Sequence, residues 1–166
     1  MSTKQIEASA ARPLKLIEAV KAHLRFRRLK EDLMNNNTAQ PDFGHSICFS
    51  LDTMNVFIDE ATNYLRKQGV ERKNRGIAFY NIINGSTTDI PQRLHNKPSI
   101  MMVASHVEPL DDSGKVNYIT NVIEAVIEGL EKNRIDDFEN LTLTKEEIDK
   151  FSSFEYDLCD VGNRHP

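Results

Sequence analysis

The sequence predicts a mainly α-helical single domain of five to six helices, and three observations favour this fold class. Apolar residues recur at helical spacing over 47–65, and a second set with this spacing covers 119–130. Residues that typically cap helices stand at the borders of these segments. The alternative is an α+β fold with short strands near 77–83 and 99–104, where the apolar runs are too short for periodicity to separate helix from strand.

The first helix is expected over 12–34, because Pro13 suits a first helical turn and the asparagines at 35–37 suit a helix end. Its apolar residues change phase near the middle of the helix. One side carries Leu16, Ile17, Val20 and Leu24, and nearly opposite lie Phe26, Leu29 and Leu33. A surface helix has one buried stripe, so this change indicates a bend, two short helices, or one helix that contacts two different partners.

The second helix has the clearest pattern, with six apolar residues on one face. These residues are Ile47, Leu51, Met54, Ile58, Ala61 and Leu65. Gly69 follows as the expected C-terminal cap, whereas the start of the helix is open between Ser46 and Ser50.

The middle of the chain is ambiguous. The segment 71–84 is a possible third helix with a β-like centre, and 99–107 is a buried helix or a buried strand. A short turn of helix is expected over 88–95, because Thr88 precedes Pro91 in the order of a helix start.

Two more helices are expected in the last third. The first covers 115–132, and the second begins at the capping box formed by Thr144 and Glu147. Ile148, Phe151 and Phe154 are expected to be buried. The predicted core combines 47–65 and 119–130 with 99–107 between them. The predicted domain covers 12–156, and flexible segments at 1–11 and 157–166 flank it.

Charge is divided unevenly along the chain. Residues 1–75 hold 13 Lys and Arg against 9 Asp and Glu, a net charge of +4, whereas residues 76–166 hold 8 against 16, a net charge of −8. The first thirty residues carry eight cations but only two acidic residues, Glu7 and Glu18. A basic segment of this kind can meet an acidic partner, and the acidic half of the same chain is one candidate.

These observations predict a non-enzymatic protein-interaction or regulatory module. We expect it to form a homo-oligomer, such as a homodimer, or to bind an acidic partner protein through the N-terminal helix. The candidate interface consists of Arg25, Phe26, Arg28, Leu29 and Leu33. Association of the basic N-terminal segment of one chain with the acidic C-terminal half of another is expected to weaken with added salt.

Nucleic-acid binding is an alternative, because cations along a helix can neutralise phosphates. The candidate residues are Lys21, Arg25, Arg27, Arg28 and Lys30. Glu18 and Asp32 stand at the two ends of this stripe, positioned to pair with its cations. A solvated, self-paired helix face is therefore favoured over a nucleic-acid interface.

A second alternative is a small metal-dependent hydrolase centred on His106 and Glu108. On a strand these two side chains point to one side and can share an ion, whereas on a helix they diverge by about 200°. Asp111 and Asp112 follow closely. The chain contains no HExxH, paired CxxC or phosphate-loop motif, so we assign no catalytic residue, no metal and no cofactor.

Two features of the sequence predict a cytoplasmic protein. The longest unbroken apolar run, 100–104, has five residues, and a membrane span needs about twenty. The polar segment 1–13 lacks the apolar core of a signal peptide. We therefore expect a cytoplasmic protein without a membrane span.

Overall fold

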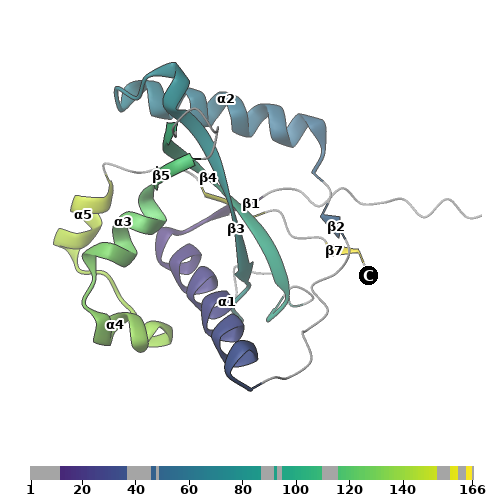
Figure 1. Ribbon diagram of the computed structural model, residues 1–166, viewed down its shortest axis with the longest axis vertical. Coiled ribbons are helices and arrows are strands. Elements are labelled where there is room, and N and C mark those ends of the chain that lie inside the picture. The colour runs from purple at the N-terminus through teal and green to yellow at the C-terminus, as the bar shows by residue number, and fades with distance from the viewer. Residues whose placement is uncertain are drawn as a thin grey trace, which may run out of the picture.

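The computed structural model describes residues 12–36, 46–47, 49–86, 92, 95–109, 116–152, 158–160 and 164–165. These residues form a mixed α+β fold (Figure 1). In chain order the elements are β1 (Arg12–Leu14), α1 (Leu16–Asn36), β2 (Ser46–Ile47), α2 (Leu51–Lys67), η1 (Arg72–Asn74), β3 (Arg75–Ile83), β4 (Pro98–Pro109), β5 (Val116–Thr120), α3 (Val122–Gly129), α4 (Lys132–Asp136), η3 (Phe138–Asn140), α5 (Lys145–Ser152), β6 (Leu158–Asp160) and β7 (Arg164–His165). The expectation of a mainly α fold is corrected in favour of the α+β alternative.

Strand β4 is the centre of a five-stranded antiparallel sheet with the order β1-β6-β4-β3. Along one edge it pairs with β3, from Arg75 opposite His106 to Ile83 opposite Pro98. Its other edge takes β5 near one end and β6 near the other. Because β1 pairs with β6, segments from the two ends of the chain lie side by side in the sheet. Strands β6 and β7 lie within the segment 157–166, for which the sequence predicts flexibility.

The side chains of β4 are buried on both faces of the sheet. Met101 and Val103 enter the core on one face, and Met102 and Ala104 enter the core on the other. Successive strand residues point to opposite faces, so a strand covered on both sides reads as an uninterrupted apolar run. This burial explains why 99–104 carries no periodicity in the sequence.

Helices cover both faces of the sheet (Figure 1). On one face, buried residues of α1, α3 and α5 pack around Met101 and Val103. On the other face, α2 places Phe57, Ala61 and Leu65 against Met102 and Ala104. The predicted arrangement of the core is confirmed, because 99–104 lies between α2 on one face of the sheet and α3 on the other.

Helix α1 begins later than expected, because Arg12–Leu14 pairs with β6 as strand β1. From Leu16 to Asn36 the helix is uninterrupted, which excludes two short helices as the cause of its phase change. The buried residues Ala19, Val20, Ala22 and Leu24 all lie in its first half. The N-terminal helix therefore packs on its own domain through that half.

Helix α2 confirms the clearest prediction from the sequence. Ser50 is its N-cap, with a side chain that accepts a hydrogen bond from the Thr53 N–H. Gly69 follows the helix in the left-handed region, at φ 75°. The buried face is rotated relative to the predicted one, because Phe57 occupies the core while Leu51 and Ile58 stay exposed.

The segment 71–84, a possible helix, contains η1 and strand β3 instead. The helix expected over 115–132 is also corrected, because it divides into β5 and α3 at Asn121, the N-cap of α3. The expected helix turn over 88–95 lies largely outside the described residues.

The capping box of α5 is confirmed, because the Thr144 N–H donates to the Glu147 carboxylate and the Glu147 N–H donates to the Thr144 hydroxyl. Phe151 is buried as expected, whereas Ile148 is 48% exposed. Phe154 lies outside the described residues.

Asn121 joins the sheet to α3. Its Oδ1 accepts hydrogen bonds from the N–H groups of Ile123 and Glu124. Its Nδ2 donates to the hydroxyl of Tyr80 at 2.9 Å and to Ser105 Oγ at 3.0 Å. One buried amide therefore caps a helix and satisfies side chains on β3 and β4.

Replacing Asn121 by alanine is expected to lower the free energy of unfolding by about 2–3 kcal/mol, because a helix cap and two buried hydrogen bonds are lost together. Urea denaturation measures the change. The control is Asn140→Ala, which removes an exposed amide bonded to Asp137 and is expected to cost about 0.5 kcal/mol or less. Equal losses in the two variants would show that Asn121 has no special role.

Candidate interaction surface

Strand β3 has an open edge. It pairs with β4 and with no other strand that the structure describes. The Asn84 N–H donates to the Lys97 carbonyl at 3.1 Å, which continues the register of the two strands. Backbone groups alternate in direction along an antiparallel strand, so those of Ile77 and Phe79 point away from β4.

The outer edge of β3 lacks the residues that usually prevent a strand edge from pairing with another chain. Lys, Pro, inward-pointing charges and β-bulges discourage pairing with other chains at exposed strand edges. The segment 76–83 contains no charged residue and no proline. Its register with β4 is continuous from Arg75 to Ile83. The edge is therefore chemically competent to accept another strand.

His23 of α1 contacts the far end of this edge. The Asn81 carbonyl accepts a hydrogen bond from His23 Nδ1 at 3.3 Å, and the His23 ring meets the Tyr80 ring edge-on at 4.8 Å. Because a carbonyl only accepts, the neutral imidazole carries its hydrogen on Nδ1. Burial lowers the pKa of His23 below 6.5, and the Asn81 bond opposes this shift.

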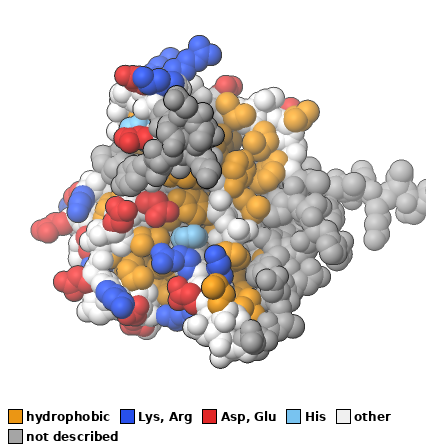
Figure 2. All heavy atoms as spheres, in the orientation of Figure 1, with side chains coloured by type: hydrophobic (Ala, Val, Ile, Leu, Met, Phe, Trp, Pro, Cys, Tyr) orange, Lys and Arg blue, Asp and Glu red, His pale blue; other side chains and the backbone are white. Residues whose placement is uncertain are grey.

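Apolar side chains accompany the open edge, and we name Phe49, Leu51, Ile58 and Phe79 the apolar strip. Phe49 is half-buried, and the other three are exposed. The rings of Phe49 and Phe79 lie 6.2 Å apart, edge to face. Leu51 is 81% exposed, Ile58 is 42% exposed and Phe79 is 53% exposed. Leu51 and Ile58 lie two turns apart on one side of α2. Figure 2 shows hydrophobic side chains gathered beside the N-terminal half of α2.

The N-terminal end of α2 lies beside β3. Phe49, just before α2, contacts Phe79, whereas Leu65, near its end, packs with Ala104, which pairs with Ile77. Helix α2 crosses this face of the sheet obliquely (Figure 1). Leu51 and Ile58 lie on its N-terminal half, the half that begins next to Phe79.

The cations of α1 make contacts inside the chain. Arg25 donates Nε and Nη2 to the two carboxylate oxygens of Glu139, each at 2.7 Å. Lys21 Nζ donates to the Glu139 carbonyl at 2.9 Å, and Arg28 donates to the Asp136 carbonyl. The Arg28 guanidinium also lies 4.4 Å from the centre of the Phe138 ring. The basic helix thus meets the acidic half of its own chain.

The other residues predicted for the α1 interface differ in exposure. Phe26, Leu29 and Leu33 are half-buried, and Arg27 and Lys30 are exposed. Binding of a partner protein or a nucleic acid by α1 stays a prediction.

His106 and Glu108 lie on a strand, as their metal-binding alternative requires. No group of three or more His, Cys, Asp or Glu side chains in the described part of the chain is arranged to hold a metal ion. His106 Nε2 instead lies 3.3 Å from Asn74 Nδ2. Asp111 and Asp112 lie outside the described residues.

No family model, curated protein or solved structure matches this chain. Among the described residues, no helix combines the length and apolar character that crossing a bilayer requires. Functional arguments therefore rest on the geometry of the chain itself.

The sequence interpretation did not predict that the side chains of the apolar strip are exposed, although two features of the sequence indicate it. Helix α2 carries more apolar residues than one face can bury, since Phe57 competes with Leu51 and Ile58. The uncharged run 76–83 also stands out in a chain with 28% charged residues.

The Arg25–Glu139 pair is expected to contribute about 1 kcal/mol of coupling energy, because it is bidentate but half exposed at Glu139. A double-mutant cycle with Arg25→Met and Glu139→Gln measures this coupling. Arg25 lowers the pKa of Glu139 below 4.5, so the coupling is present at neutral pH and is lost as the pH falls through the lowered pKa. Arg27→Met with Glu139→Gln serves as the control cycle, and a coupling of zero for Arg25 would contradict the assignment.

His23 is expected to make stability fall with acidification. Its folded-state pKa lies below 6.5 because of burial, with Glu124 raising the pKa and Arg27 lowering it by smaller amounts. As the pH falls below 6.5, the unfolded chain binds a proton at this site before the folded chain does, so folding weakens. Urea denaturation from about pH 5 to pH 7.5 measures this slope, which His23→Gln is expected to reduce. An identical slope in the variant would contradict this role.

Proposed function

We propose that the protein is a non-enzymatic interaction module that self-associates through the open edge of β3 and the apolar strip. The observation that carries the proposal is the edge of β3, which pairs with no second strand among the described residues, has no charge over 76–83 and has the exposed Phe79 at its centre. An edge of this kind pairs readily with a second strand. The proposed interface thus lies away from Arg25 and Arg28 of α1, which contact the acidic segment of the chain.

Two copies fit this edge through a two-fold axis. Antiparallel pairing centred on Phe79 places Phe79 opposite its own copy and Ile77 opposite Asn81 of the second chain. The Asn81 carbonyl already accepts from His23, so it would use its second lone pair for Ile77 of the second chain. Arg75 then lies opposite Ile83, so no pair of like charges meets across the β3 interface. The same patch serves both copies, as a two-fold interface requires.

The apolar strip supplies a driving force of suitable size. Covering an exposed Leu, Ile or Phe side chain contributes up to about 1.5–3 kcal/mol, and a two-fold interface covers each one twice. Association itself costs at least about 4 kcal/mol in lost translation and rotation. This apolar contribution exceeds the lower bound of the cost, so the balance permits a dimer.

The two alternatives have less support. Three of the five cations considered for nucleic acid contact the segment 136–139 of the same chain. A metal-dependent hydrolase needs more ligands than His106 and Glu108 provide.

Light scattering after size exclusion tests the proposal. The wild-type chain is expected to be mainly dimeric at about 200 μM, and Phe79→Lys is expected to be monomeric, because a charge at the edge opposes pairing. Ile148→Lys is the matched control, since Ile148 is similarly exposed but lies on α5. A monomeric wild type, or a Phe79→Lys dimer, would contradict the proposal.

A further inference from the structure

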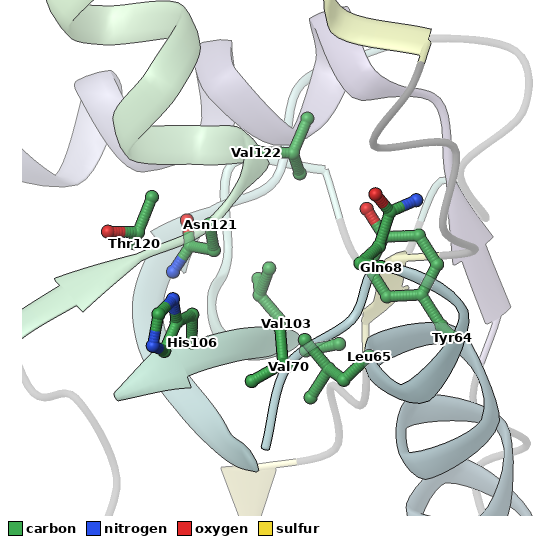
Figure 3. A pocket seen from close by; sticks show the side chains of 10 residues that line it. Tyr64, Leu65, Gln68, Val70, Val103, His106, Thr120, Asn121 and Val122 are labelled. Carbon is green, nitrogen blue, oxygen red and sulfur yellow. The ribbon is translucent and has the colours of Figure 1, made fainter. Parts of the chain in front are cut away.

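A pocket of about 190 Å³ lies at the C-terminal end of α2, away from the apolar strip (Figure 3). It is bounded by α2, by β4, and by the junction between β5 and α3. The lining residues are Tyr64, Leu65, Gln68, Val70, Val103, Ala104, His106, Thr120, Asn121 and Val122. None of these residues is Lys, Arg, Asp or Glu, so the walls hold no acidic or strongly basic side chain that could pair with a charged ligand.

The pocket lies where a small side chain of β4 meets the end of the covering helix. Earlier on β4, this face of the sheet carries Met102, which is fully buried in the same cluster as Phe57 of α2. Ala104 takes the next position on this face, because side chains alternate along a strand. Helix α2 ends at Lys67, and the chain turns at Gly69. A methyl group therefore lies on the sheet at the point where the helix above it stops.

Apolar side chains make up the middle of the pocket. Leu65, Val70 and Val103 lie next to one another there, and Val122 faces them from the start of α3 (Figure 3). The polar side chains stand at the two sides of this apolar centre. A ligand in the middle of the pocket thus gains mainly from covering apolar surface, at about 25 cal/mol per Å².

Four of the five polar side chains that line the pocket interact with other groups of the chain. Asn121 uses both atoms of its amide, Oδ1 for two N–H groups of α3 and Nδ2 for hydroxyls on β3 and β4. His106 Nε2 lies 3.3 Å from Asn74 Nδ2. Tyr64 and Gln68 each interact with another group as well. A ligand that needs hydrogen bonds would compete with these contacts.

We propose that this pocket binds an uncharged, single-ring hydrocarbon of about six or seven carbon atoms. The size follows from the volume, since an apolar cavity of about 150 Å³ holds benzene. The absence of charge follows from the walls, because a buried charge without a charged partner is costly. The absence of polar atoms on the ring follows from the apolar centre and from the wall groups that are already engaged.

Titration with benzene and pyridine, followed by ¹H–¹⁵N NMR, tests this proposal. Benzene is expected to cause saturable shifts at backbone amides of 64–70, 103–106 and 120–122, with a dissociation constant of about 1 mM. Pyridine has nearly the same size and shape but carries a ring nitrogen that accepts hydrogen bonds. It is expected to bind at least about tenfold more weakly, because this nitrogen loses water without gaining a partner.

Two variants separate shape from polarity. Ala104→Leu fills the pocket with an apolar side chain and is expected to weaken benzene binding at least about tenfold. Thr120→Val removes a hydroxyl from the wall, keeps its shape and is expected to leave benzene binding unchanged. Loss of binding in Thr120→Val would show that a polar group carries the recognition.

A second pair of variants locates the site if the Ala104→Leu chain does not fold. Gln68→Trp places a bulky side chain at the exposed rim and is expected to weaken benzene binding at least about tenfold, whereas Lys67→Trp, one residue away and outside the lining, leaves it unchanged. Amide spectra outside the pocket confirm that each variant is folded. Absent saturation in the wild type, pyridine binding as tight as benzene binding, or undiminished binding by the filled variants would each overturn the proposal. None of these outcomes depends on self-association.

Discussion

The burial of β4 on both faces is the constraint on which the rest of the structure depends. Met101 and Val103 require a cover on one side, and Met102 and Ala104 require a cover on the other. Helix α2 alone covers the second face within the described residues, so that layer is narrow (Figure 1). A single helix does not bury all of its apolar residues against two strands. Leu51, Ile58 and Phe79 are therefore left at the side of β3, where the sheet ends.

Opposite charges within the chain stabilise the other layer. The basic first helix reaches Glu139 and the carbonyl of Asp136, which belong to the acidic half. Helix α1 packs against β3 through its buried apolar residues, and His23 reaches the Asn81 carbonyl at the strand edge. Charge complementarity is thus used to assemble the fold, and the uncharged edge of β3 is the surface that we propose for association. The uneven division of charge in the sequence predicted that the basic N-terminal segment would meet an acidic segment. It did not show whether that acidic segment belongs to the same chain or to a second chain.

The sequence predicted those helix ends that are formed by residues close together in the chain. The Ser50 cap, Gly69 and the Thr144 capping box depend on residues a few positions apart, and each is present in the structure. The strand at 98–109 depends on burial from two sides, which hides its periodicity. The strand at 75–83 depends on its pairing with that strand. Strands β1 and β6 pair with each other, although almost the whole chain separates them in the sequence. The apolar strip was out of reach for a similar reason, because its exposure is decided by Phe57, which takes the place in the core that spacing alone assigned to Ile58.

Hydrogen exchange at the Phe79 amide tests the central claim most directly. This N–H points away from β4, so in a monomer it exchanges with solvent quickly for a strand residue. Pairing of two β3 edges gives it a hydrogen-bond partner. The account predicts that protection of the Phe79 amide increases with protein concentration, while the inward-pointing amide of Tyr80 is protected at every concentration. Protection at Phe79 that is independent of concentration would contradict the association of two copies through this edge.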